Sequence, residues 1–362
     1  MDSILRKTPL HKAHLELKAR MVDFAGWDMP VLYTSILDEA RAVRNSVGIF
    51  DISHMGRTRI AGERATALLQ SLTSNDVDAL KPSEAQYSLL TNSEGGIIDD
   101  IIVYRESAEA YLVVINASNT DKDLDWIRSH NPDQVSIENN TDRTAMIAVQ
   151  GPKAPQLVAD LANNPSLLEL DRFQYATGTI AGVPLTTFCR TGYTGEDGFE
   201  LIVTADQAQT VWNALIAGGA VACGLGARDA LRIEAGYPLY GHEIDDLTTP
   251  VEAGLMWVVK LDKGPFTGSD HIAAVKANGP KRRLVGLVSK ERIQPRQGYT
   301  IYAGSEEIGI VTSGIFSPVK GHSVAMGYVS TSHTKSGTPV EIAIRDKRAA
   351  ATVVPKKNLM DY

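Results

Sequence analysis

The sequence predicts an α+β protein of two or three domains that ends in a small all-β barrel or sandwich. Its 362 residues exceed the size at which one hydrophobic core stops growing, so more than one domain is expected. From Arg282 onward, short apolar runs recur about every ten residues and are broken by Gly, Ser, Thr and Pro. Upstream of Arg282, strand-like runs mix with helical patterns, which is typical of α+β units.

Composition excludes several classes of protein. With 43% hydrophobic and 22% charged residues the chain resembles an ordinary globular protein, and no stretch approaches the ~20 apolar residues of a membrane span. The first residues, MDSILRKTPLHKAH, lack the apolar core of a secretory signal. We therefore expect a cytoplasmic protein, or one of the mitochondrial matrix if a eukaryotic precursor has lost its transit peptide.

Metal and nucleic acid are not expected as partners. The two cysteines, Cys189 and Cys223, are too few for a disulfide framework or a thiolate site, and a reducing compartment fits them. The eight histidines show no HxxxH or HxH pairing. A net charge of −7 argues against broad binding to a phosphate backbone, because that requires clustered Lys and Arg.

The first part of the chain predicts a compact α+β unit over residues 51–141. A helical pattern over residues 36–47 precedes a strand at 56–60 and a short helix at 63–72. QYSLLTN, the turn SEGG and IIDDIIVYR then predict a β-hairpin, since β-branched residues flank a Gly pair that tolerates positive φ. Another strand, AYLVVIN, and a helix over residues 120–129 follow.

A second α/β unit is predicted from a boundary near residue 142. TAMIAVQGPKAPQLVADL indicates a strand, a Gly-Pro turn and a helix. TTFCRTGYTGEDGFELIV indicates a strand, a Gly-rich loop and a second strand, before a helix over residues 205–218. The linker to the β-rich tail is expected between residues 260 and 279.

The segment GGIIDDIIVYR places two carboxylates, Asp99 and Asp100, inside an apolar β-branched run. Neighbouring side chains of a strand face opposite ways, so at least one carboxylate is expected to be partly buried. A buried carboxylate must find hydrogen-bond or charge partners or its proton affinity rises, and either state suits a group that handles protons. The alternative is that both residues cap a hairpin end in solvent.

The segment TGYTGEDGFE is not a phosphate loop, because its spacing departs from the known motifs and it carries three acidic residues and no Lys. Such a loop suits a ligand with amide or ring N–H donors, which a carboxylate such as Glu200 can accept. The alternative is an ordinary surface hairpin.

In CGLGARDALRIEAGYPLYGHEID, small residues precede Arg228 and Asp229, and Asp229 is predicted in the first turn of a helix. Arg228 then has either a structural role in an ion pair or a recognition role toward a carboxylate or carbonyl of a substrate. His54 and Met55, in ISHM, line either a pocket or a core, and we assign His54 no catalytic role.

Taken in order along nearly the whole chain, seven segments resemble the successive signatures of the aminomethyltransferases, the T-proteins of the glycine cleavage system. They are TPLHKAHLELKARMVDFAGWDMPVLY, FDISHMG, QYSLLTNSEGGIIDDIIVYR, VQGP, TGYTGEDGFE, GLGARDALRIEAGYPLYGHEID and TSGIFSP. The resemblance implies a three-domain cloverleaf around a central folate cavity. Its first domain is discontinuous, residues 1–50 and 142–260, its second is ferredoxin-like, residues 51–141, and its third is a β-barrel, residues 275–362.

The same resemblance implies an enzyme of glycine catabolism and one-carbon metabolism. Its co-substrate is tetrahydrofolate, its partner is the lipoyl-bearing H-protein, and its products are methylene-tetrahydrofolate, ammonia and dihydrolipoyl H-protein. Asp100 takes the position of the family's key carboxylate, next to N5 and N10 of the folate, and Asp99 is its neighbour in the same motif. The residues expected around the folate are Met55, Tyr87, Asp100, Tyr104, Asn116, Tyr193, Glu200 and Arg228.

Two relatives of the same fold remain as alternatives. One is a folate-dependent demethylase of a small methylated amine or sulfur compound, over which the paired Asp99 and Asp100 favour the aminomethyltransferase. The other is a non-catalytic folate-binding assembly factor, whose hallmark Cys is replaced by Pro238 in YPLYGHE. The tail AATVVPKKNLMDY departs from the family's usual ending, so no residue is assigned to that end of the folate site beyond Tyr362 as a candidate.

Overall fold

The computed structural model describes residues 4–317, 319–357 and 359–362, and it mixes helices and strands throughout, as predicted for an α+β protein. The chain divides into two compact units. Unit 1 comprises Met1–Gln70, Val77–Tyr87 and Ile101–Asp229, and unit 2 comprises Ser71–Asp76, Ser88–Asp100 and Ala230–Tyr362. The predicted three-domain bounds are a different division and stay a prediction.

The core of unit 1 is a six-stranded sheet in the order β10-β11-β12-β9-β3-β13. Its strands are β3 (Gly48–Asp51), β9 (Thr144–Gln150), β10 (Tyr175–Ile180), β11 (Val183–Cys189), β12 (Gly198–Thr204) and β13 (Val221–Ala222). Every pairing is antiparallel except that of β13 with β3. The Gly-rich loop joins β11 to β12, which pair with each other. This confirms the strand, loop and strand predicted for TTFCRTGYTGEDGFELIV.

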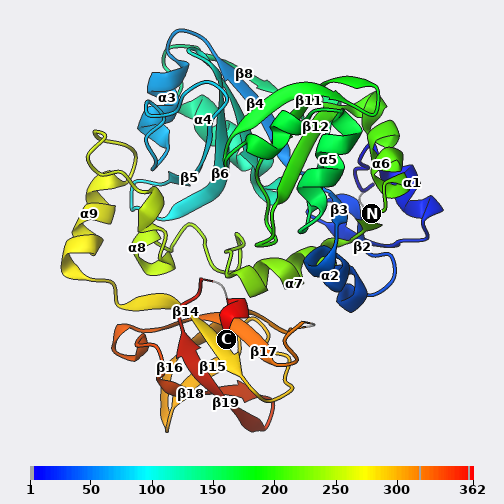
Figure 1. The fold of residues 1–362 in the computed structure, drawn as a ribbon. Helices are drawn as coiled ribbons and strands as arrows, with labels where there is room; N and C mark the ends of the chain where they lie inside the picture. The colour runs from blue at the N-terminus through cyan, green and yellow to red at the C-terminus, as the bar shows by residue number, and fades with distance from the viewer. Residues whose placement is uncertain (1–3, 318, 358) are drawn as a thin grey trace. The chain divides into compact units, whose positions relative to one another are not determined.

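Helices α5 (Ala154–Ala162) and α6 (Ala208–Ala217) pack against this sheet, as Figure 1 shows. Apolar residues of both helices join those of the strands in one buried cluster, which includes Val158 and Trp212. Pro155 in the first turn of α5 suits that position, because its missing N–H would have no partner inside the helix. The inner strand β12, between β11 and β9, contributes Leu201 and Val203 to this cluster.

A second sheet has five strands in the order β5-β6-β7-β4-β8. They are β4 (Gly56–Ala61), β5 (Ala85–Thr91), β6 (Ile97–Ser107), β7 (Ala110–Ile115) and β8 (Ser136–Asn139), with helices α3 (Ala65–Leu72) and α4 (Thr120–Ser129) between them in the chain. β5 and β6 are neighbours, and the turn between them is closed by Asn92 and Gly96, whose backbone N–H and C=O bond at 2.9 Å. The predicted hairpin and the helix after it are therefore confirmed.

The tail of the chain forms a closed six-stranded barrel in the order β14-β17-β16-β15-β18-β19, yellow to red in Figure 1. The strands are β14 (Arg282–Ser289), β15 (Thr300–Ala303), β16 (Glu306–Phe316), β17 (Ser323–Ser330), β18 (Pro339–Ile344) and β19 (Lys347–Val354). Pairing of β14 with β19 closes the barrel and removes its edges. The barrel prediction is confirmed, and β15 is the strand that the pattern of apolar runs missed.

The remaining elements lie outside these two sheets and the barrel. They are α1 (His11–Glu16), β1 (Arg20–Phe24), β2 (Trp27–Leu32), α2 (Ile36–Asn45), α7 (Leu225–Ala235), α8 (Pro250–Ala253) and α9 (Ser269–Asn278). The 3-10 helices are η1 (Ala117–Asn119), η2 (Thr141–Arg143), η3 (Pro165–Glu169), η4 (Ala205–Gln207), η5 (Met256–Val258), η6 (Thr331–His333) and η7 (Leu359–Asp361). Among the helices described, none is both long and apolar enough for a membrane crossing.

Two local predictions need correction. Helix α7 begins at Leu225, so Asp229 is its fifth residue and lies beyond the first turn, where a carboxylate gains most from the helix dipole. The small residues Gly226 and Ala227 are helical because α7 starts before them, although Gly is a poor helix former. The segment predicted as a linker contains the ten-residue helix α9, whose Ile272 is buried.

Candidate functional site

The two carboxylates of β6 differ in burial, as strand alternation predicts. Asp99 is 0% exposed and lies on the face of β6 that carries the buried Ile101. Asp100 is half-buried and lies on the opposite face, which it shares with Tyr104. The expectation that at least one carboxylate is removed from water is confirmed, and the alternative of two solvated capping residues is wrong for Asp99.

Within unit 1, Glu200 of β12 accepts a hydrogen bond at the end of a chain of two hydroxyl groups. Thr191 donates its hydroxyl to Oε2 of Glu200 at 2.5 Å, and Tyr104 Oη lies 3.3 Å from Thr191 Oγ1. Since the one hydroxyl hydrogen of Thr191 goes to Glu200, Tyr104 is the donor to Thr191. Burial raises the pKa of Glu200, while the bond from Thr191 and the charge of Arg228 act in the opposite direction. Glu200 is therefore part of the sheet and not of the Gly-rich loop.

Arg228 projects from α7 and joins residues from two other segments. Its guanidinium carbon lies 4.7 Å from the ring centre of Tyr193, and Nη2 lies 3.9 Å from Sδ of Met55. Burial lowers the pKa of Arg228, and the negative charge of Glu200 opposes that effect. Nη1 is buried and has no hydrogen-bond partner among the described residues. A buried N–H donor without an acceptor is costly, and a ligand oxygen next to this atom would remove that cost.

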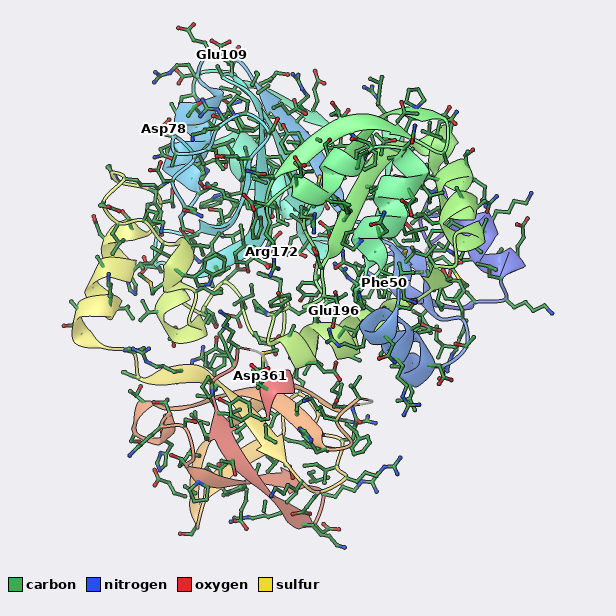
Figure 2. All side chains as sticks on the ribbon, in the orientation of Figure 1. Phe50, Asp78, Glu109, Arg172, Glu196 and Asp361 are labelled. Carbon is green, nitrogen blue, oxygen red and sulfur yellow. The ribbon has the colours of Figure 1, made fainter. Side chains whose placement is uncertain are left out.

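The loop that contains Tyr193 is hydrogen-bonded to the side chains of Gln150 and Arg44. Gln150 donates through Nε2 to the carbonyl of Thr191 at 3.1 Å and accepts from Thr194 at 3.0 Å. Arg44 of α2 donates to the carbonyl of Thr194 and to Glu196, labelled in Figure 2, at 2.7 and 2.9 Å. These bonds fix the conformation of the loop between the antiparallel strands β11 and β12, and its role in binding a ligand stays a prediction.

Two positions in that loop require glycine. A Cβ at Gly192 would lie 1.9 Å from Oε1 of Gln150, which is far inside van der Waals contact. Gly195 has φ +82°, in the left-handed region that favours glycine. The Gly spacing noted in the sequence therefore serves the packing of Gln150 and the turn of the loop, and not a phosphate.

His54, to which we assigned no role, lies beside this group. It is buried, its ring meets that of Phe24 edge-on at 5.5 Å, and its Nδ1 has no hydrogen-bond partner among the described residues. Burial lowers the pKa of His54 to about 3, Asp51 raises it, and the cations Arg228 and Arg57 lower it further. The imidazole is therefore neutral at pH 7. The sequence signal that pointed here was the ISHM segment, but one His carries no information about its partners.

The burial of His54 predicts a specific pH dependence. Folded His54 has a pKa of about 3 and unfolded His54 about 6.5, so unfolding takes up a proton between those values. The contribution of neutral His54 to the free energy of unfolding is complete above about pH 6.5 and is lost as the pH falls toward 3. In NMR spectra, the His54 imidazole, assigned with a His54→Asn variant, should not titrate between pH 8 and 5. A midpoint near pH 6.5 would contradict this prediction.

Two predicted residues lie outside the contacts described above. Tyr87 is half-buried in β5, and Asn116 precedes η1, where its carbonyl accepts from Asn119 N at 3.0 Å. Unit 1 therefore brings together Met55, Tyr104, Tyr193, Glu200 and Arg228, while Asp100 ends a segment of unit 2. Within the described ranges, no three His, Cys, Asp or Glu side chains are grouped to hold a metal ion.

Comparison with known proteins identifies relatives along the whole chain. Residues 10–263 match the model of the GCVT N-terminal domain, and residues 282–358 match that of the glycine cleavage T-protein C-terminal barrel domain. An aminomethyltransferase of Symbiobacterium thermophilum is 44% identical over 98% of this chain and 97% of its own length. One from Chloroherpeton thalassium is 46% identical over 97% of this chain and 98% of its own.

A solved structure agrees with these relatives. The crystal structure of the glycine cleavage system aminomethyltransferase T from Bartonella henselae matches with a TM-score of 0.90 at 34% identity. The match covers 98% of this chain and 99% of that one. The similarity therefore includes the barrel as well as the two sheets.

Proposed function

The chain belongs to the aminomethyltransferase family, the T-proteins of the glycine cleavage system, and from this membership we propose that its co-substrate is tetrahydrofolate and its partner the lipoyl-bearing H-protein. It is a transferase of one-carbon groups in glycine catabolism. The reaction we propose takes the aminomethyl group from the lipoyl arm and yields methylene-tetrahydrofolate and ammonia. The observation that carries the proposal is that the buried carboxylate of Glu200 and the half-buried guanidinium of Arg228 lie within each other's electrostatic field.

The chemistry of this pair fits a folate. A pterin ring presents N–H donors on one edge and a carbonyl oxygen beside them, so it needs an acceptor and a donor in a dry site. Glu200, whose Oε2 is occupied by Thr191, would accept from the ring donors through Oε1. Arg228 would donate through Nη1, the buried atom that has no described partner. The cation–π contact with Tyr193 would help hold the guanidinium of Arg228 in place for that bond.

We assign Asp100 the chemical role. Tetrahydrofolate, when bound, supplies the amine that receives the one-carbon unit. As a carboxylate next to that amine, Asp100 would raise its nucleophilicity and offset the positive charge that develops as ammonia departs. General acid–base catalysis contributes typically about 10²- to 10⁴-fold, and positioning of two bound reactants contributes more, so no covalent intermediate on the enzyme is needed.

The other predicted contacts complete the proposal. Met55, Tyr87, Tyr104, Asn116 and Tyr193 would surround the folate, as the resemblance implies. No metal is needed for a transfer between an amine and an aminomethyl thioether. The similar proteins reported above come from bacteria, which favours the cytoplasm over the mitochondrial matrix.

The proposed function predicts tetrahydrofolate-dependent release of ammonia. The purified chain is mixed with tetrahydrofolate and aminomethylated H-protein, and ammonia is followed over time. Two matched reactions serve as controls, one without tetrahydrofolate and one with H-protein that carries an unloaded lipoyl arm. Ammonia should rise only in the complete mixture, and equal rates with and without tetrahydrofolate would contradict the proposal.

A further inference from the structure

Arg57, at the start of β4, is a buried cation whose side-chain N–H groups all donate hydrogen bonds. It is 1% exposed, and each of its five side-chain N–H donors has an acceptor. Nη1 donates to the carbonyl oxygens of Ser53, at 3.0 Å, and of Met55. Nη2 donates to the carbonyl oxygens of Thr141 and Thr144 at 2.6 and 3.0 Å, and Nε donates to Thr144 Oγ1 at 2.7 Å.

These bonds tie two segments that are far apart in the chain. One is the loop of Ser53 and Met55 before β4, and the other is η2 with the first residue of β9, 84 to 87 residues later. The backbone of Arg57 adds to the connection, since its N–H donates to Thr141 Oγ1 at 3.0 Å. The loop therefore has its position set by a side chain that does not itself reach the candidate site.

That loop carries two of the residues next to Arg228. Met55 places its sulfur 3.9 Å from Nη2 of Arg228, and the neutral His54 lies within the field of the same cation. We propose that Arg57 is a positioning residue for the co-substrate site, which holds Met55 and His54 against Arg228 by fixing the backbone of their loop. This inference rests on the proposed function, because it takes Arg228 as part of the folate site.

Only a guanidinium can make this set of bonds. Lysine would offer three donors from one point, whereas the acceptors here lie around a planar fork and number five. Burial lowers the pKa of Arg57 to about 10 and the nearby Asp51 opposes the shift, so the side chain stays charged at pH 7. Replacement by Lys keeps the charge but leaves buried carbonyl groups without donors, which loosens the loop.

The test compares Arg57→Lys with Arg59→Lys. Arg59 lies two residues further along β4, on the same face, and its side chain is 42% exposed and pairs with Glu106 at 2.8 Å. We expect Arg57→Lys to raise the KM for tetrahydrofolate by at least about tenfold while kcat changes by less than about threefold. Arg59→Lys should leave both constants within about twofold. A merely structural role of Arg57 would lower kcat through loss of folded protein and leave KM unchanged, and that result would overturn the inference.

A double variant tests whether Arg57→Lys changes the KM through Met55. If Arg57 acts through Met55, Arg57→Lys should raise KM by less than about threefold in a Met55→Leu background, because coupled residues are not additive. Met55→Leu conserves volume, so the core is expected to tolerate it. If Arg57→Lys still raises the KM about tenfold in the Met55→Leu background, Arg57 does not act through Met55.

A spectroscopic measurement keeps this test separate from that of the proposed function. In protein labelled at the methionine methyl groups, Arg57→Lys should shift or broaden the Met55 resonance, and Arg59→Lys should not. This spectrum is recorded without tetrahydrofolate or H-protein. If the wild-type chain releases no ammonia, the proposed function fails whatever the variants do. If it does turn over, an unmoved Met55 resonance together with an unchanged KM in Arg57→Lys overturns the inference alone.

Discussion

Replacing Asp100 with asparagine is expected to lower turnover by at least about 10²-fold while the affinity for tetrahydrofolate stays close to that of the wild type. Asparagine keeps the shape and the hydrogen-bonding oxygen of the side chain but carries no charge. The binding groups that we assign, Glu200 and Arg228, are unchanged by the substitution. The interaction lost is therefore the one with charge that develops during transfer, which affects kcat.

The measurement is ammonia release at saturating tetrahydrofolate, with binding followed separately by calorimetry. A matched control is Glu94→Gln, which removes a carboxylate from the turn of the same hairpin, where its side chain is 82% exposed. That variant should turn over like the wild type. Near-normal turnover of Asp100→Asn would remove the mechanism, and loss of tetrahydrofolate binding would show that Asp100 acts in binding instead.

Arg232→Met is expected to cost about 3–5 kcal/mol of stability in unit 2. The Arg232 side chain is 1% exposed, and its Nη1 lies 2.7 Å from Oε2 of Glu243, whose side chain is 0% exposed. Its Nη2 donates to Ser313 at 2.7 Å. Removal of the cation leaves a buried carboxylate without its counter-charge, and the Coulomb term that offset its desolvation is lost.

Native-state hydrogen exchange of the amides of β16 and β17 reports the opening free energy of the barrel directly. The control is Arg348→Met in the same unit, where Arg348 and Glu341 are 38% and 43% exposed and 3.4 Å apart. A solvated pair of this kind contributes about 0–1 kcal/mol, so its loss should have little effect. Equal losses in the two variants would contradict the role of burial.

Local patterns were sufficient for much of the fold. The helix over residues 120–129 was predicted with the bounds that the structure has, because one apolar face at helical spacing lies between polar residues. The hairpin around Asp99 and Asp100 followed from strand-like runs on either side of a Gly pair. The barrel followed from the regular recurrence of short apolar runs. For the helix and the hairpin the signal lies within short stretches of the chain, and for the barrel it is the repetition of such stretches.

Some elements were missed for the same reason. Helix α1 has six residues and β15 has four, too few for a period to be recognised. The start of α7 was placed too late because Gly226 is a poor helix former, whereas in the structure the backbone of Gly224 approaches that of Val31 too closely to admit a Cβ. The close packing of the chain at Gly224 against Val31 therefore accompanies a helix start that the low helix propensity of Gly226 does not favour.

By itself the sequence determined the α+β class, the hairpin with its alternately buried carboxylates, the barrel and, through resemblance, the family. Only the tertiary structure decided which buried polar groups have partners. Arg228 meets Met55 across 173 residues and Arg44 meets Thr194 across 150, while Nη1 of Arg228 is left without a described acceptor. Periodicity tells which side of an element is buried, but the electrostatics of a site depend on side chains brought together from distant segments, and no local pattern encodes that distance.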